Sequence, residues 1–190
     1  MEILLGSKSP RRQALLKDVG ILFTSVNIDS DEDFHESMNP ELVAEYLAIK
    51  KSNAYVEKLE NQVLITADTV VFLDQQIINK PQNKAHAINM LQKLSGKKHT
   101  VYTGVCLRTE SQIFSFTDKT NVYFKVIAQE EIEYYVSHFN PLDKAGAYGI
   151  QDWIGYIGIA KIDGDFFNVM GLPINRVYDQ LKKLNAIRLI

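Results

Sequence analysis

The chain has 190 residues, which is enough for one domain or for two small lobes that share a core. Hydrophobic residues make up 46% of it and charged residues 23%, as in ordinary soluble globular proteins. The formal net charge of -2 argues against a general nucleic-acid-binding protein, which carries a basic excess, so an anion site must be a local cluster of positive charge.

The chain begins with a short apolar run and a helix start. Residues 3–5 read as a short buried strand. Ser9 is predicted to cap the following helix and Pro10 to be its first residue, which is the usual order. Arg11 and Arg12 then fall in the first turn, where the positive end of the helix dipole makes two arginines unfavourable on their own.

Two interpretations of this helix start remain open. The hydroxyls of Ser7 and Ser9, the N–H groups of the first turn and the guanidinium groups of Arg11 and Arg12 would together suit a polyanion such as a phosphate chain. Alternatively, the segment is a basic turn whose arginines point into water.

The rest of the chain alternates between helical and extended patterns, and the first helix is predicted over 11–19 with Gly20 as its end. The later patterns predict an extended segment over 21–28, a helix over 40–59, a strand over 63–73, a helix over 83–95, strands over 99–107, 113–116 and 122–127, a helix over 130–139, a hairpin of 157–162 with 166–169, and a helix over 173–184. This order predicts a mixed α/β protein with a sizeable sheet, as a single domain over residues 1–190.

The chain contains one cysteine, Cys106, in an apolar run that suits the core. No intrachain disulfide can form, which fits a reducing compartment. The first residues lack the pattern of a signal peptide, and no apolar run reaches membrane-spanning length. We therefore expect a cytoplasmic protein that has neither nucleic acid nor a membrane as a partner.

Asp68 interrupts the apolar strand predicted over 63–73. A buried carboxylate without a partner is costly, so Asp68 must be paired, bound to a metal or located at an opening of the core. A strand end or a bulge would also expose it. We favour a functional role, because general-base and metal chemistry both use a carboxylate in such a setting.

Lys51 lies on the apolar stripe of the helix predicted over 40–59, four residues after Leu47. A lysine there can also pack its stem and extend its amine into water. The acidic run 29–33 lacks the glycine and the glutamate that a calcium loop requires. One of its carboxylates could still join Asp68 around a magnesium-type cation.

Two later segments could contact a ligand. Pro81 holds Lys80 extended, so its amine projects in a defined direction, although a plain surface lysine is the default. The small residues of 143–151 allow a close backbone approach, and the Gln151 amide offers a donor and an acceptor that can read a flat base edge. An ordinary glycine-containing turn would explain the same segment.

Taken together, these segments resemble the Maf family of nucleoside triphosphate pyrophosphatases. The resemblance implies an elongated α/β fold with a mixed sheet, flanking helices and a cleft between two lobes, related to the inosine triphosphate pyrophosphatases. It also implies a homodimer. The stretches that carry it follow the family's order along nearly the whole chain: Ser7-Lys8-Ser9-Pro10-Arg11-Arg12, Ala67-Asp68-Thr69-Val70-Val71, Lys80-Pro81, Leu94-Ser95-Gly96, Thr103-Gly104-Val105, 143–151 and Gly171-Leu172-Pro173.

The resemblance also implies site roles. Asp68 would be the catalytic carboxylate that activates water, and with Glu32 it would hold a divalent metal, Mg²⁺ or Mn²⁺. Lys51 and Lys80 fall at the family's two catalytic lysine positions. The implied substrate-binding residues are Ser7, Ser9, Arg11, Arg12, Thr69 and Gln151.

The implied reaction is hydrolysis of a nucleoside triphosphate to the monophosphate and pyrophosphate. Asp68-Thr69 together with Gln151 resembles the subgroup that prefers dTTP and UTP. After Gln151 the family usually continues with Gly-x-Gly, whereas this chain reads Asp152-Trp153-Ile154-Gly155, which changes the rim that selects the base. Two alternatives remain: a preference for 7-methyl-GTP or other purine nucleotides, and a nucleotide-binding regulator of septum formation without significant turnover.

Overall fold

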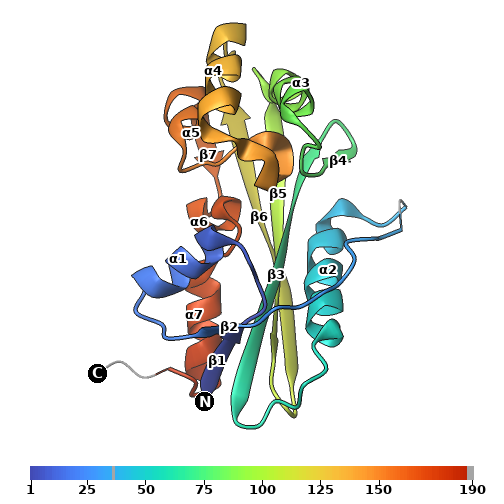
Figure 1. The fold of residues 1–190 in the computed structure, drawn as a ribbon, viewed down its shortest axis with the longest axis vertical. Coiled ribbons are helices and arrows are strands. Elements are labelled where there is room, and N and C mark those ends of the chain that lie inside the picture. Colours follow the sequence, from blue (N-terminus) through green and yellow to red (C-terminus); the bar gives the residue numbers. More distant parts are fainter. Residues whose placement is uncertain (36, 188–190) are drawn as a thin grey trace. The chain divides into compact units, whose positions relative to one another are not determined.

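The structure is a computed structural model, and it describes residues 1–35 and 37–187 (Figure 1). Its elements are of the mixed α/β class that the sequence predicts. The strands are β1 (Glu2–Leu5), β2 (Thr24–Ser25), β3 (Gln62–Leu73), β4 (Gln76–Ile78), β5 (Lys98–Arg108), β6 (Ile113–Phe124) and β7 (Ile159–Asp163). The helices are α1 (Pro10–Asp18), α2 (Pro40–Ala54), α3 (Lys84–Leu94), α4 (Gln129–Phe139), α5 (Trp153–Gly158), α6 (Phe166–Met170) and α7 (Ile174–Lys183), with short 3₁₀ turns at Pro141–Asp143 and Ala145–Ala147.

Within the described residues one sheet contains all seven strands, in the order β2-β1-β3-β5-β6-β7, with β4 paired to β3. β1 is parallel to both β2 and β3, and its register places Leu5 beside Ile65. β4 is antiparallel to β3, and β7 is antiparallel to β6. Because β1 and β3 run in the same direction, the loop after Leu5 and the continuation of β3 toward Asp68 leave this pair at the same end.

The chain forms two compact units, and three of the boundaries between them fall within β3, β5 and β6, while the fourth directly follows α6. The first unit consists of Met1–Asp68, Thr103–Asp118 and the chain from Gly171 onward. The second consists of Thr69–Tyr102 and Lys119–Met170. The core of the second unit is a cluster of buried apolar side chains from its strands and from α3, α4 and α5. No helix among the described residues is both long and apolar enough to cross a bilayer.

In the first unit, α2 lies unusually close to the sheet. Gly104 on β5 faces the helix backbone, and a Cβ at this position would lie 2.1 Å from the carbonyl carbon of Ala44. One turn further along, the hydroxyl of Thr66 on β3 donates a hydrogen bond of 2.7 Å to the carbonyl of Ala48. These two contacts fix the height of α2 on the sheet and its position along β3.

Several local predictions are confirmed. Pro10 is the first residue of α1, and the predicted strand over 63–73 is β3. The side chains of Asn39 and Asn83 accept hydrogen bonds of 3.1 and 2.9 Å from backbone N–H groups in the first turns of α2 and α3. Gly20 and Gly96 follow their helices with φ near +70°, the left-handed conformation that glycine adopts without strain.

One helical boundary and one extended segment differ from the predictions. The helix predicted over 40–59 ends at Ala54, because the Tyr55 carbonyl accepts a bond of 2.8 Å from Arg108 and Leu59 packs instead with Leu4 and Leu64. Of the segment predicted over 21–28, only Thr24–Ser25 pairs as a strand. The helix predicted over 173–184 is present as α7.

The predicted hairpin of 157–162 with 166–169 is wrong. β7 begins at Ile159, and Phe166–Met170 is the helix α6. The carboxylate of Asp165 accepts the N–H groups of Phe167 and Asn168 at 3.0 and 3.2 Å, and this cap overrides the strand preference of the aromatic residues. The strands predicted over 113–116 and 122–127 are one strand, β6, whose polar middle is hydrogen-bonded, as at Thr120.

Candidate active site

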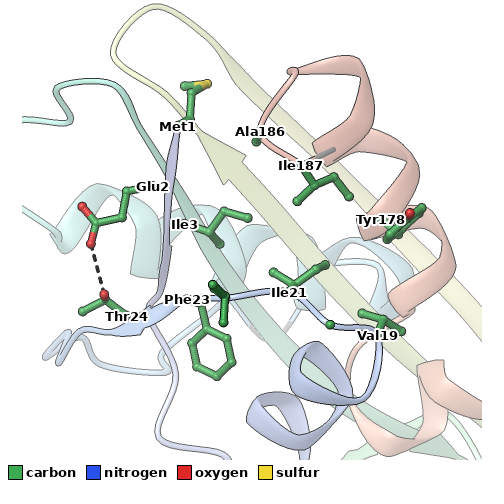
Figure 2. A pocket seen from close by; sticks show the side chains of 12 residues that line it. Met1, Glu2, Ile3, Val19, Ile21, Phe23, Thr24, Tyr178, Ala186 and Ile187 are labelled. Carbon is green, nitrogen blue, oxygen red and sulfur yellow. Dashed lines mark hydrogen bonds between the residues drawn. The ribbon is translucent and has the colours of Figure 1, made fainter. Parts of the chain in front are cut away.

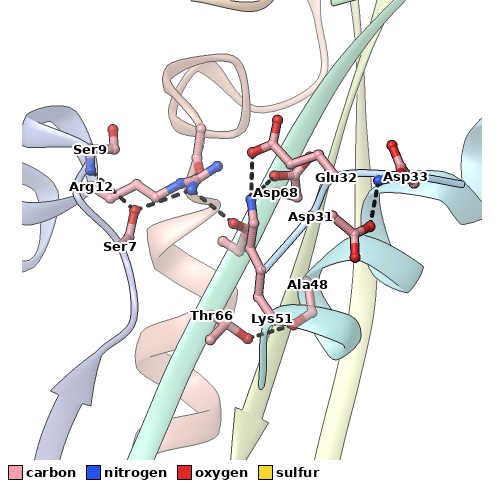
Figure 3. A network of polar contacts seen from close by, with 12 residues as sticks. Ser7, Ser9, Arg12, Asp31, Glu32, Asp33, Ala48, Lys51, Thr66 and Asp68 are labelled. Atoms are coloured by element: carbon pink, nitrogen blue, oxygen red, sulfur yellow. Dashed lines mark hydrogen bonds and ion pairs between the residues drawn. The ribbon is translucent and has the colours of Figure 1, made fainter. Parts of the chain in front are cut away.

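Asp68 and Lys51 form the centre of the candidate site (Figure 3). Asp68 is 7% exposed, and its Oδ1 accepts a hydrogen bond from the Lys51 ammonium on α2. The same ammonium donates to Oε1 of Glu32 at 3.0 Å. Of the settings expected for Asp68, the structure shows a paired carboxylate, and the amine of Lys51 is directed at two carboxylates rather than only at water.

The acidic run 29–33 is divided between two neighbouring lysines. The Lys50 ammonium donates hydrogen bonds to the carboxylate of Asp31 and to the carbonyl of Asp33, and both of these aspartates are exposed. The ammonium of Lys51, one residue further along α2, donates to the carboxylate of Glu32. Successive helical residues point about 100° apart, so α2 presents Lys50 to the exposed part of the run and Lys51 to Asp68. Glu32 is therefore the residue of this run that shares a partner, the Lys51 ammonium, with Asp68.

Arg12 joins three parts of the first unit. Its Nε donates to the carbonyl of Gly171 at 2.7 Å, and its Nη1 donates to the carbonyl of Ala67 at 2.8 Å. Nη1 also lies 3.3 Å from the hydroxyl oxygen of Ser7. The guanidinium therefore holds α1 against β3 beside Asp68 (Figure 3). Sequence reasoning missed this structural role, because its acceptors are backbone carbonyls, which every residue carries.

The start of α1 is as predicted in position but not in its bonding. Ser9 occupies the cap position, yet its side chain makes no capping hydrogen bond. Instead the backbone N–H of Ser9 donates to the hydroxyl of Ser7 at 3.2 Å. Arg11 and Arg12 lie in the first turn of α1, as expected. Basic side chains, a hydroxyl and a helix start are thus grouped at one place, which is what an anion requires.

The charges at this place influence one another. Burial lowers the pKa of Arg12 below its ordinary value, the charge of Asp68 opposes that effect, and the charge of Arg11 adds to it. A guanidinium stays protonated throughout the physiological range, so Arg12 keeps its charge at the cost of its burial and, to a smaller extent, of its repulsion by Arg11. An anion bound beside Arg11 and Arg12 would relieve this repulsion.

The other predicted residues lie in the second unit. Thr69 follows Asp68 directly in β3, and Lys80 is exposed in the loop after β4. The N–H of Gly146 donates to the carbonyl of Asn79 at 3.3 Å, so the loop that carries Lys80 lies beside the predicted segment 143–151. At the end of that segment, Oε1 of Gln151 is buried and accepts no hydrogen bond from the residues that the structure describes.

Trp153 belongs to the part of the chain that departs from the family pattern. Its ring lies 5.1 Å from that of Tyr134, centre to centre, and it is partly buried at the start of α5. Cys106 is fully buried, as predicted, and burial raises the pKa of its thiol. That setting makes it a core side chain and not a nucleophile.

A separate hollow lies in the first unit, at the amino end of β1 (Figure 2). Its volume is about 640 Å³, and apolar side chains such as Ile3, Ile21 and Phe23 line most of it. None of the predicted site residues lines it. Ser7, Arg12 and Asp68 lie beyond the carboxyl end of the paired part of β1, so the polar cluster and this hollow are distinct features.

The carboxylate pair fits a divalent cation of the magnesium type. The described residues contain no group of three or more histidine, cysteine, aspartate or glutamate side chains that could hold a metal. Magnesium sites, however, commonly use one or two carboxylates and complete the shell with water and substrate phosphates. Glu32 and Asp68 already converge on one positive charge, the Lys51 ammonium.

Comparison with known proteins identifies the chain's relatives. It is 45% identical to the dTTP/UTP pyrophosphatase of Bacteroides thetaiotaomicron over 185 residues, which cover 96% of both chains. It is also 45% identical to the proteins of that name from Christiangramia forsetii, with 96% and 94% covered, and Porphyromonas gingivalis, with 95% and 93% covered.

A solved structure resembles the fold. The HAM1 protein from Coxiella burnetii aligns with a TM-score of 0.51 at 14% sequence identity, over 96% of this chain and 99% of that one. At this identity the likeness concerns the fold alone. The sequence model of the family described as "Maf-like protein" matches residues 2–184, which include every residue of the candidate site. Since that match spans both units and the relatives align over nearly their full length, the chain belongs to the Maf-like protein family.

Proposed function

We propose that this protein hydrolyses dTTP and UTP, with related noncanonical pyrimidine nucleotides, to the nucleoside monophosphate and pyrophosphate. The observation that carries the proposal is the Asp68–Lys51–Glu32 cluster beside the basic start of α1. It combines a carboxylate that can act on water with positive charge for a phosphate chain. The names of the relatives, dTTP/UTP pyrophosphatases, support the same reaction.

Each residue of the first unit has a role that follows from its position. Lys51 binds Oδ1 of Asp68, so we assign Oδ2 the task of accepting the proton of the attacking water. Arg11, Arg12, Ser7 and Ser9 would hold the phosphates at the start of α1. Phosphoryl transfer depends mainly on positioning and on neutralising the developing charge, which these cations supply.

The second unit would contribute Lys80, Thr69 and Gln151. Lys80 would add positive charge for the departing pyrophosphate. Thr69 directly follows Asp68, the proposed general base, in β3. Oε1 of Gln151 is a buried acceptor that lacks a donor among the described residues. Uracil and thymine carry an N3–H donor that Oε1 can accept, whereas N3 of cytosine is an acceptor, so Gln151 favours the former two while its amide keeps this orientation.

We also propose that Glu32 and Asp68 hold Mg²⁺ or Mn²⁺ during the reaction. When bound, the ion would neutralise phosphate charge, and its remaining ligands would be phosphate oxygens and water. The Lys51 ammonium stands between the same two carboxylates, so it stabilises them when the ion is absent.

Release of pyrophosphate from a panel of nucleotides, with Mg²⁺ or Mn²⁺, tests the proposed function. We expect turnover of dTTP and UTP, and a loss of about 10²–10⁴-fold in Asp68→Asn with the fold intact by circular dichroism. The matched control is Asp74→Asn, which changes an exposed aspartate at the β3–β4 turn and should keep full activity.

Preferred cleavage of 7-methyl-GTP or ITP would overturn the assignment to the dTTP/UTP subgroup. Nucleotide binding without turnover would favour a regulator.

We further propose that the protein is a cytoplasmic homodimer. The single, buried thiol of Cys106 is compatible with a reducing compartment, and the family resemblance supports the dimer. Light scattering after size exclusion should give about twice the chain mass of 21.6 kDa. Fractionation of cells should find the protein in the cytosol. A particle with the mass of one chain would contradict the homodimer, and recovery of the protein outside the cytosol would contradict the cytoplasmic location.

A further inference from the structure

A buried tyrosine lies behind the segment that ends in Gln151. Tyr135 is on α4 in the second unit and is 0% exposed. It belongs to the apolar stripe formed with Ile132 and Val136, and its ring stacks on Phe139 with centres 5.3 Å apart. Its ring position is therefore fixed by the core, and its hydroxyl is held at one place.

The Tyr135 hydroxyl bonds two points of the same turn. It donates to Oδ2 of Asp152 at 2.8 Å and accepts the backbone N–H of Gly149 at 3.1 Å. Burial, and then the charge of Asp152, raise the pKa of Tyr135, so the phenol keeps its proton and remains a donor. One hydroxyl thus ties both ends of the turn Gly149–Asp152 to α4.

The turn is also closed on itself. The N–H of Asp152 donates to the carbonyl of Gly149 at 3.0 Å, and the carbonyl of Asp152 accepts the N–H of Gly155 at 2.9 Å. The Lys144 ammonium lies 3.7 Å from Oδ2 of Asp152. A Cβ at Gly149 would be 2.4 Å from that same oxygen, so the carboxylate sits where any other residue would place its side chain.

Gln151 lies between the two anchored residues. Its backbone can rotate little while Gly149 and Asp152 are both held, so the point from which its side chain extends depends on the Tyr135 hydroxyl. Asp152 is also the first residue of the stretch that departs from the family's Gly-x-Gly pattern. The residue that departs is therefore part of the anchor.

We propose that Tyr135 is a positioning residue for base recognition: its hydroxyl, through Gly149 and Asp152, holds the turn that presents the Gln151 amide to the pyrimidine. This inference rests on the proposed function, in which Gln151 contacts the base. Tyr135 itself touches no substrate. Its removal should change selectivity and KM rather than the chemical step.

The variant Tyr135→Phe tests this role, because it keeps the ring in the core and deletes only the hydroxyl. We expect kcat/KM for UTP to fall about tenfold, mainly through KM, and the preference for UTP over CTP to shrink by a similar factor. Asp152→Ala removes the other partner of the bond and should give the same change. The control is Ser95→Ala, which deletes another hydroxyl that accepts a backbone N–H in this unit, from Ile127 at 2.8 Å. It should lower stability without changing the UTP to CTP ratio.

A double-mutant cycle separates positioning from general loosening of the fold. If Tyr135 acts through Gln151, Tyr135→Phe should add no further loss to Gln151→Ala. Additive losses, or an unchanged UTP to CTP ratio in both Tyr135→Phe and Asp152→Ala, would overturn the positioning role while the proposed function stands. A wild-type protein that releases no pyrophosphate from any nucleoside triphosphate would overturn the proposed function, and the positioning role with it.

Discussion

Lys51 on α2 donates a hydrogen bond to Oδ1 of Asp68 on β3, and this ion pair joins the helix to the strand at the centre of the candidate site. The side chains of Lys51 and Asp68 are 16% and 11% exposed, so neither charge is well hydrated. Removing one partner of such a pair leaves the other poorly compensated. The pair therefore links the stability of the first unit to the charges of the site.

Lys51→Met removes the ammonium and keeps a side chain of similar length. We expect kcat/KM for UTP to fall at least about a hundredfold, because both Asp68 and the phosphates lose a cation. The neighbouring variant Lys50→Met breaks the exposed pair with Asp31 and the bond to the carbonyl of Asp33, neither of which involves Asp68, and its activity should stay within about twofold of the wild type. Pyrophosphate release measures both variants. Equal losses of activity in the two would show that the Lys51 ammonium has no role in the site beyond that of a surface lysine.

Glu32→Gln tests the carboxylate pair as a metal site. The variant should need about ten times more Mg²⁺ for half-maximal rate, because one hard, charged ligand becomes neutral. Asp31→Asn is the matched control, since Asp31 is adjacent but bonds Lys50. Titration of the rate with Mg²⁺ at saturating nucleotide measures the difference. An unchanged Mg²⁺ requirement in Glu32→Gln would remove Glu32 from the set of ligands.

Gly104→Ala tests how α2 is held. The new Cβ would meet the backbone of Ala44, so α2 must move away from β5, and Lys51 moves with it. We expect a loss of about 3 kcal/mol or more in the free energy of unfolding by urea, together with reduced activity. At Gly20 a new Cβ would meet no atom of the described residues within 4 Å, but φ is +73°, so Gly20→Ala should cost only about 1–2 kcal/mol and leave activity intact. Similar losses in the two variants would contradict this account.

His99 should make stability depend on pH. It is 1% exposed, and burial lowers its pKa from 6.5 to about 4 while Nε2 keeps a contact of 2.7 Å with the Tyr148 hydroxyl. Between pH 6.5 and 4 the unfolded chain binds this proton and the folded chain does not, so stability falls as the pH falls. The full difference corresponds to about 3 kcal/mol at 1.36 kcal/mol per pKa unit.

Urea unfolding at pH 7, 6, 5 and 4.5 measures this dependence. His99→Gln removes the titrating group, so its stability should change less over this range than that of the wild type. His138→Gln alters an exposed histidine on α4 and should follow the wild-type curve. A slope that is the same in wild type and His99→Gln would show that other groups control the acid sensitivity.

Local rules account for much of what was predicted correctly. Asn39 and Asn83 begin helices because their side chains satisfy N–H groups of the first turn, and this needs only neighbours in sequence. The run 63–73 is a strand because its apolar residues suit burial, and Asp68 stood out as the one residue that such a run should exclude. The same local reasoning failed at Phe166–Met170, where the cap from Asp165 outweighed the aromatic preference for a strand.

The sequence by itself determined the fold class, the family and the residues with unusual chemistry, since these follow from hydrophobic periodicity and from motifs in order along the chain. Only the tertiary structure decided which groups bind one another in the site. Lys51 pairs with Asp68 and Glu32. Arg12 donates to the carbonyls of Ala67 and Gly171, and Tyr135 holds the turn Gly149–Asp152. The physical reason is that these partners are distant in sequence and often backbone atoms. Their meeting depends on the height of α2 over Gly104 and the register of β1 against β3, which no local pattern encodes.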